Sequence, residues 1–219
     1  MRRTNLLLCV CALLSIQGNA LATTLQLYDG TDLNGFTVHG PATWSGAGGI
    51  LQNTDTADAE SYLTYDTPLS SDSFFLQVQV TVLEGMRFRL HGVFDQLYIG
   101  NEGFIRQFEM YGSQLTNSQQ VSDDSYLTDV SYTLRLEKDA DGDVRLYQDG
   151  VLTHTGDVGA LPDLNITILA GDDFSPGKIQ ITSLTYGSLV PEPSAVAPAA
   201  LGGLILLAAG IQKRRRCPR

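Results

Sequence analysis

Cysteine is absent from most of this chain. Its three cysteines, Cys9, Cys11 and Cys217, all lie near the two ends. The long central region therefore has no disulfide, no thiol nucleophile and no cysteine-based metal site. A region of this length can bury a core of its own, so it needs no covalent crosslink even outside the cell.

Basic residues are also scarce in the centre of the chain. The whole chain has 14 Lys and Arg against 24 Asp and Glu, a net charge of −10. Half of the basic residues fall in the two ends, so residues 23–189 keep 7 basic and 23 acidic side chains, a net charge of about −16. A domain this acidic repels phosphate backbones, which excludes nucleic acid as a partner.

Helical periodicity is nearly missing between residues 23 and 189. Apolar and polar residues alternate instead, which is typical of strands buried on one face. The alternating runs are 76–82, 86–91, 132–137, 164–168 and a last run from residue 179. In that last run the phase slips near Ser183, as a β-bulge would cause. Turn pairs such as Asp149-Gly150 separate the runs. We predict one all-β unit over residues 23–189, a concanavalin-like β-sandwich or jelly roll.

The N-terminal end has the features of a secretion signal. Arg2 and Arg3 precede the apolar run 6–16, and Ala20-Leu21-Ala22 follows it. A basic start, an apolar stretch too short to span a membrane comfortably and small residues at the cleavage site define a signal peptide. We predict a signal peptide over residues 1–22, with cleavage after Ala22. The alternative is an N-terminal membrane anchor.

The C-terminal end, residues 190–219, carries three features in order. Pro191-Glu192-Pro193 is followed by the apolar stretch 195–211 and then by the basic cluster 213–216. This order resembles the PEP-CTERM sorting signal, which implies a membrane-bound exosortase as partner and a Gram-negative host that makes exopolysaccharide. We therefore expect the secretion machinery to export the protein. It would be held briefly in the inner membrane by this segment and then reach the cell surface or the extracellular space. The alternative is a plain tail anchor.

The start of the central region resembles a second family. The segments Leu27–Phe36 and Trp44–Leu51 are similar to the opening of concanavalin-like proteins, some of which are named 3-keto-disaccharide hydrolases. Here Thr31 and Phe36 stand where that family has Lys and Trp. The segment Tyr132–Thr155 is similar to the laminin-G pattern of strand, turn and strand. The resemblance implies the fold and leaves the activity open.

Two sets of side chains are candidates for ligand binding. Arg87, Arg89 and His91 share one face of an expected strand, and Arg106 could lie near them in the sheet. Such a face could bind acidic or neutral sugars, or it could simply be an exposed surface balanced by the surrounding acids. Glu109 lies in a strand-like segment between aromatic residues, where a hydrolase would place a carboxyl group. The alternative for Glu109 is a solvent-facing strand residue.

Asp139, Asp141 and Asp143 resemble the start of a calcium loop. Gly142 comes too early for such a loop, and no glutamate closes it. A polar hairpin tip is the simpler interpretation. We therefore expect no metal site and no cofactor, with calcium kept as an alternative.

These observations favour a non-catalytic protein that binds glycan or is associated with exopolysaccharide or biofilm. Two alternatives remain: a carbohydrate-active hydrolase of the 3-keto-disaccharide type, and a purely structural matrix protein. The acid pair that most glycoside hydrolases need is not evident in the sequence, which favours binding over hydrolysis.

Overall fold

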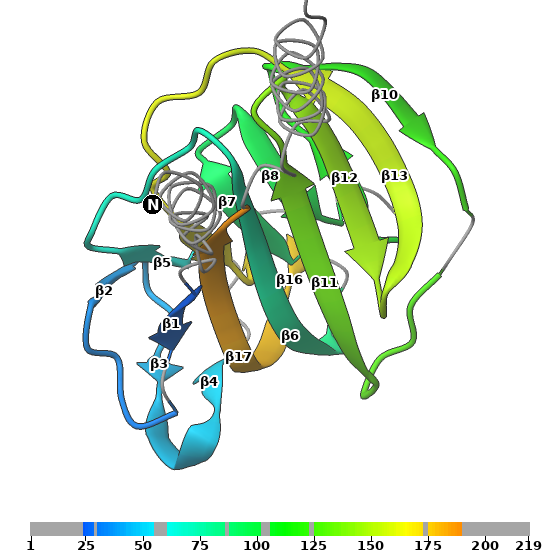
Figure 1. Cartoon of the computed structure of the whole chain (residues 1–219). Helices are drawn as coiled ribbons and strands as arrows, with labels where there is room; N and C mark the ends of the chain where they lie inside the picture. The colour runs from blue at the N-terminus through cyan, green and yellow to red at the C-terminus, as the bar shows by residue number, and fades with distance from the viewer. Residues whose placement is uncertain are drawn as a thin grey trace, which may run out of the picture.

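The computed structural model of the chain describes residues 24–28, 30–54, 61–85, 88–101, 106–122, 125–172 and 175–189. In these ranges, antiparallel strands form two large sheets that lie one behind the other as a β-sandwich (Figure 1). The predicted all-β fold is confirmed. The expected signal peptide and sorting tail, including Pro191, Glu192 and Pro193, lie outside the described residues. No helix within the described ranges is long and apolar enough to cross a membrane.

The front layer in Figure 1, called sheet A here, contains nine of the described strands. In spatial order they are β10 (Leu115–Gln120), β13 (Val151–Val158), β12 (Asp143–Gln148), β11 (Ser131–Lys138), β6 (Phe74–Glu84), β17 (Lys178–Ser188), β4 (Leu51–Asn53) and β3 (Trp44–Ser45). Strand β1 (Thr24–Tyr28) pairs with β17 beside this path. Strands β6 and β17 share the longest register in the molecule and form the centre of the sheet.

The second layer, called sheet B here, contains six of the described strands. Their order is β2 (Phe36–His39), β5 (Tyr62–Tyr65), β14 (Thr167–Leu169), β7 (Arg89–Val93), β8 (Leu97–Gly100) and β9 (Glu109–Tyr111). A short 3-10 turn, η1 (Ala47–Gly49), and the small ribbon of β15 (Gly171–Asp172) and β16 (Ser175–Pro176) complete the described elements.

The inner faces of the two sheets meet in one hydrophobic core. Sheet A contributes the alternating residues of β6, Val78 and Val80 among them, and sheet B contributes Leu90, Ile99 and Ile168. All five side chains are fully buried. Burying a side chain of this size stabilises the fold by about 1.5–3 kcal/mol. The period-two pattern therefore identified the core faces of these strands correctly.

The final strand shows the irregularity that its sequence predicts. The register of β17 against β6 shifts between Ile181 and Ser183, which confirms the expected bulge. Strand β17 also pairs with β1, where Thr24 lies opposite Gly187. The chain therefore enters and leaves the sandwich at neighbouring positions.

The predicted turn between β12 and β13 is also present. Asp149 and Gly150 both have positive φ, at 51° and 82°, as a two-residue type I′ hairpin requires. The side chain of Asp149 accepts a hydrogen bond from the backbone N–H of Thr133 on the neighbouring strand, at 2.8 Å. The turn is thus tied back to the outward face of sheet A.

Candidate functional site

Strand β7 carries two of the three residues predicted to form a ligand face. Phe88 and Leu90 are fully buried in the core, so Arg89 and His91 lie on the opposite, outward face of sheet B. This agrees with the predicted alternation. Arg87 lies outside the described residues.

His91 differs from the expectation in one respect, because it is not exposed. Its side chain is 0% exposed, since its ring lies between two other aromatic rings. Phe94 stacks on one side at a centroid distance of 4.9 Å, and Tyr98 stacks at 4.4 Å. Strand alternation gives the face on which a residue lies, but it does not reveal a neighbouring turn that folds over it.

The stack continues across the sheet. Tyr98 of β8 is paired with Tyr111 of β9, and their rings lie 5.5 Å apart at an interplanar angle of 23°. Phe94, His91, Tyr98 and Tyr111 therefore form a row of four rings, called the aromatic row here. Phe94, at the turn end of the row, is 46% exposed and offers an open hydrophobic surface. The faces of the interior rings, His91 and Tyr98, are mostly covered by the rings stacked against them.

Burial in the aromatic row controls the charge of His91. Desolvation, and then the positive charge of Arg89, lower the pKa of His91 to about 3, so the ring is neutral at neutral pH. The backbone N–H of Asp95 donates to Nδ1 of His91 at 3.3 Å, which places the ring proton on Nε2. Nε2 is buried and meets no hydrogen-bond partner among the described residues.

Arg89 and Glu109 lie beside the aromatic row, on either side of Gly100. Both residues are in register with Gly100, from β7 and from β9 respectively. A Cβ on Gly100 would lie 2.0 Å from the backbone oxygen of Phe88, so no other residue fits there. The guanidinium carbon of Arg89 lies 5.8 Å from the ring centre of Tyr98. A basic group and an acidic group thus flank a position that carries no side chain.

Glu109 is bound to the end of the aromatic row. The hydroxyl of Tyr111 donates a hydrogen bond to the Glu109 carboxylate. Partial burial raises the pKa of Glu109 above its ordinary value. A carboxyl group of this kind can accept hydrogen bonds from a ligand, and it can also hold a proton more readily than an exposed glutamate.

Arg106 pairs with Tyr126 through its backbone oxygen, and the aspartate-rich turn joins β11 and β12 of sheet A. The charge of Arg106 acts on Tyr126, where it opposes the larger effect of burial. Asp139 accepts hydrogen bonds from the backbone N–H groups of Asp141 and Asp143, at 3.1 and 3.0 Å, and pairs with Arg145. The run thus forms a hydrogen-bonded hairpin tip. Among the described residues, no three His, Cys, Asp or Glu side chains are grouped so that they could hold a metal ion.

Sequence reasoning missed Phe94 and Tyr98 as members of the site. Tyr98 had a usable signal, because it alternates with Leu97 and Ile99, both of which are fully buried. Phe94 had none, since it belongs to a turn, where strand periodicity does not apply.

Comparison with known proteins shows the fold. No family model matches the chain, and no curated protein matches it. Among solved structures, it is similar to the exoplasmic/lumenal domain of VIP36 in a form bound to Ca²⁺ and Man3GlcNAc (TM-score 0.58, 13% identity, 80% of this chain and 92% of that chain). It is also similar to a Parabacteroides distasonis protein described as a glycosyl hydrolase (TM-score 0.56, 12% identity, 76% of this chain and 100% of that chain). A sialidase matches at a TM-score of 0.56 and 10% identity over 76% of this chain, which spans only 18% of the sialidase. At these identities, the likeness establishes the β-sandwich fold of the chain.

Proposed function

We propose that this chain is an exported protein of the cell surface or extracellular matrix, whose β-sandwich binds glycan on the outward face of sheet B. The observation that carries the proposal is the aromatic row, with Arg89 and Glu109 beside it. Sugars are recognised by aromatic surfaces together with a few fixed polar groups. The fold similarity to VIP36, a protein solved with a bound mannose glycan, supports the same conclusion by analogy.

Export is proposed from the two ends of the sequence. The signal-peptide features of residues 1–22 and the Pro191-Glu192-Pro193 motif support delivery by the secretion machinery and sorting by an exosortase. The exopolysaccharide or biofilm matrix of the host is then the natural source of the glycan. The acidic charge of the domain favours solubility in that setting.

Glu109 supports a second candidate, hydrolysis. Burial raises the pKa of Glu109, which suits a general acid, and the hydrogen bond from Tyr111 fixes the position of the carboxyl group. Most glycoside hydrolases need a second carboxyl group roughly 5–10 Å away. Across the paired positions of β7, β8 and β9, Glu109 is the single carboxylate on the outward face. Binding is therefore the better-supported function.

A glycan array tests the proposal. The full-length chain in mild detergent would be applied to uncharged and uronic-acid oligosaccharides, in parallel with Phe94→Ala and Val121→Ala. Phe94 and Val121 are both exposed hydrophobic residues, at 46% and 47%, but Val121 follows β10 of sheet A. We expect Phe94→Ala to weaken binding at least about ten-fold and Val121→Ala to leave it unchanged, since surface changes remote from a site cost little.

Three outcomes would decide between the functions. Equal glycan binding by Phe94→Ala and Val121→Ala would show that the glycan does not bind at the aromatic row. Binding to no glycan at all would favour the structural-matrix alternative. Release of sugar from a disaccharide or 3-keto-disaccharide, abolished by Glu109→Gln while binding persists, would make the protein a hydrolase.

A further inference from the structure

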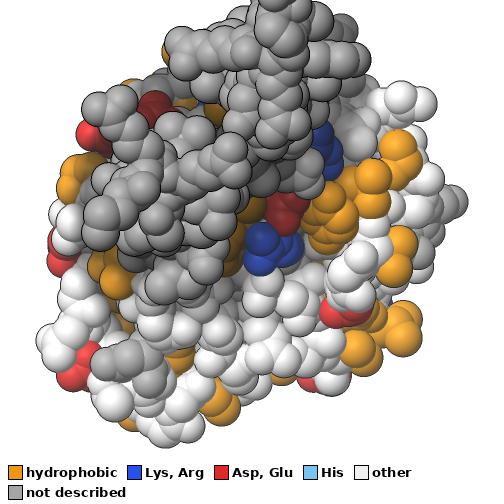
Figure 2. Space-filling view, in the orientation of Figure 1, with side chains coloured by type: hydrophobic (Ala, Val, Ile, Leu, Met, Phe, Trp, Pro, Cys, Tyr) orange, Lys and Arg blue, Asp and Glu red, His pale blue; other side chains and the backbone are white. Residues whose placement is uncertain are grey.

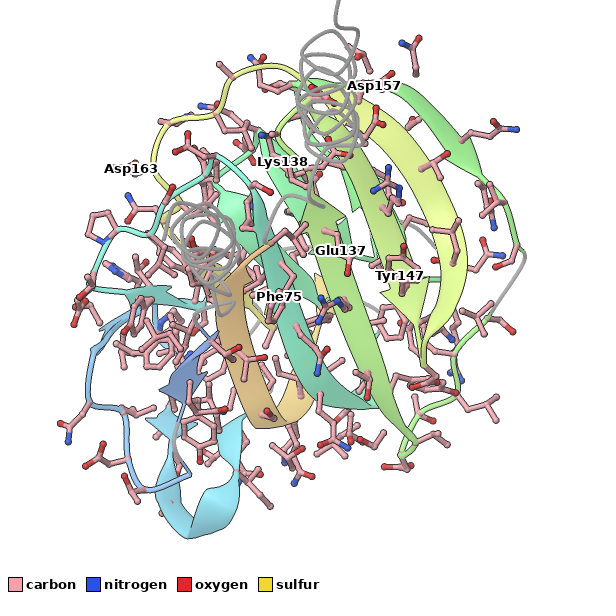
Figure 3. The ribbon with its side chains drawn as sticks, in the orientation of Figure 1. Phe75, Glu137, Lys138, Tyr147, Asp157 and Asp163 are labelled. Carbon is pink, nitrogen blue, oxygen red and sulfur yellow. The ribbon has the colours of Figure 1, made fainter. Side chains whose placement is uncertain are left out.

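The outward face of sheet A carries a hollow of about 630 Å³ that is separate from the aromatic row. Its lining comes from β6, β11, β12 and the turn that follows β12: Gln77, Thr133, Arg135, Glu137, Tyr147, Asp149 and Gly150. Figure 3 shows Phe75, Glu137 and Tyr147 on neighbouring strands of this sheet. Figure 2 shows basic, acidic and hydrophobic side chains adjoining one another on the same face.

Strand pairing explains why these side chains converge. Arg135 lies directly opposite Gln77 of β6 on one side and opposite Tyr147 of β12 on the other. Period-two geometry points all three side chains away from the core, because the intervening Leu134 and Leu136 are fully buried. Asp149 and Gly150, in the turn that accepts a hydrogen bond from Thr133, also line the hollow.

Arg135 is held in one position by contacts on three sides. Its Nε donates to Glu137 at 2.6 Å, and its Nη1 donates to Oε1 of Gln77 at 3.4 Å. Its guanidinium carbon lies 3.9 Å from the ring centre of Phe75, which is only 8% exposed. Side chains that are ordered before a ligand arrives lose little entropy when it binds.

The charges of the hollow select against anions and against purely apolar molecules. Arg135 is neutralised by Glu137, and Asp149 adds a second negative charge in an already acidic domain. Burial, and then the charge of Glu137, raise the pKa of Tyr147, so its hydroxyl stays neutral. The hollow therefore offers hydrogen-bond donors and acceptors in alternation beside one aromatic ring, that of Tyr147. That combination matches an uncharged molecule with many hydroxyl groups.

We propose that this hollow is a second saccharide site, which binds uncharged sugars through Tyr147, Gln77 and the Arg135–Glu137 pair. Its volume falls within the usual range for small-molecule sites. The site is independent of the aromatic row. If the proposed function of sheet B also holds, the sandwich binds glycan on both outward faces and can crosslink two polysaccharide chains.

Calorimetric titration of the full-length chain in mild detergent tests this proposal, with cellohexaose and laminarihexaose as uncharged probes and a galacturonate hexamer as the anionic one. The variants are Tyr147→Ala and Gln77→Ala. Thr182→Ala is the matched control, because Thr182 is exposed on the same face, where it bonds Gln79. Tyr147→Phe keeps the ring if the alanine variant does not fold. Phe94→Ala removes the aromatic-row contact.

We expect Tyr147→Ala to weaken the binding of an uncharged probe at this site about ten-fold, which corresponds to about 1.4 kcal/mol. Thr182→Ala should have no effect, and the galacturonate hexamer should not occupy the hollow. If both faces bind one probe, each of Tyr147→Ala and Phe94→Ala should weaken one of the two binding events about ten-fold and leave the other unchanged.

The remaining outcomes separate the two proposals. Binding that Phe94→Ala abolishes and Tyr147→Ala leaves unchanged would overturn the second site and keep the first. Binding that only Tyr147→Ala weakens would keep the second site and overturn the first. Preference for the galacturonate hexamer that persists in Phe94→Ala would overturn the selectivity assigned to the hollow. Equal loss of binding in Thr182→Ala would overturn its location.

Discussion

The two outward faces of the sandwich bury polar and aromatic groups in different ways. On sheet B, His91 is buried by rings stacked against it, and its charge is suppressed. On sheet A, Phe75 is covered by Arg135, whose charge is retained and neutralised by Glu137. Both arrangements fix the side chains of an outward surface, but only the first depends on keeping a titratable group neutral.

This difference has a consequence for solution conditions. Stacked rings are insensitive to salt, whereas an ion pair whose side chains are 30% and 19% exposed is partly screened. Conversely, the sheet B face is sensitive to acid because protonated His91 is disfavoured there. Each face can therefore be perturbed separately.

The largest expected effect separates the core from an outward face. Phe88 is fully buried between the sheets and packs edge-on against Phe108. Phe88→Ala should therefore lower the free energy of unfolding by about 3–5 kcal/mol, because it leaves a closed cavity. Phe75→Ala should cost about half as much, since water or the Arg135 side chain can fill an outward site. Urea unfolding midpoints measure both, and equal losses would show that Phe75 is packed like a core residue.

The sequence predicted the core more completely than the surface. Strand alternation placed Leu90, Phe88 and Ile168 in the core correctly. Successive side chains of a strand point to opposite faces of the sheet, so the odd or even position of a residue indicates whether it faces the core. The bulge near Ser183 was predicted for the same reason, since it appears as a break in that alternation. Neither result required knowledge of which strands are neighbours.

The outward faces could be predicted only in part, because they depend on pairing between distant strands. Arg89 and Glu109 are 20 positions apart in the sequence, and only the register through Gly100 brings them to the same part of the sheet. The hollow on sheet A joins Gln77 to Tyr147 in the same way. The odd or even position of a residue in its strand determines the sheet face on which it lies. The pairing register determines which residues of other strands lie beside it, and the sequence of one strand alone does not determine that register.

The second prediction concerns acid stability and tests the sheet B face. The pKa of His91 is about 3 in the folded protein and near 6.5 when unfolded, so the unfolded chain binds the proton more readily between these values. Stability contributed by neutral His91 is fully present above pH 6.5 and is lost as the pH falls toward 3. The slope reaches at most about 1.4 kcal/mol per pH unit.

His91→Phe is the matched variant, because it keeps a ring between Phe94 and Tyr98 but cannot be protonated. Its free energy of unfolding should depend less on pH than that of the original chain between pH 6.5 and 5, above the range where most carboxylates titrate. His154 has a lowered pKa for the same reason, burial, and remains in both proteins. Identical pH slopes would mean that His91 accepts a proton in the folded state.

The smallest effect is expected for the ion pair on sheet A. Glu137→Gln keeps the shape of the side chain and removes the negative charge that pairs with Arg135. Because both partners are partly exposed, the loss of stability should stay below about 1 kcal/mol and should shrink further in 1 M salt. Arg135 would still lie over Phe75, since that contact depends on the guanidinium rather than on Glu137. Urea unfolding at low and high salt measures the difference. A loss above 2 kcal/mol that persists in high salt would mean that Glu137 is held as a buried charge, and the two faces would then be ordered by the same means.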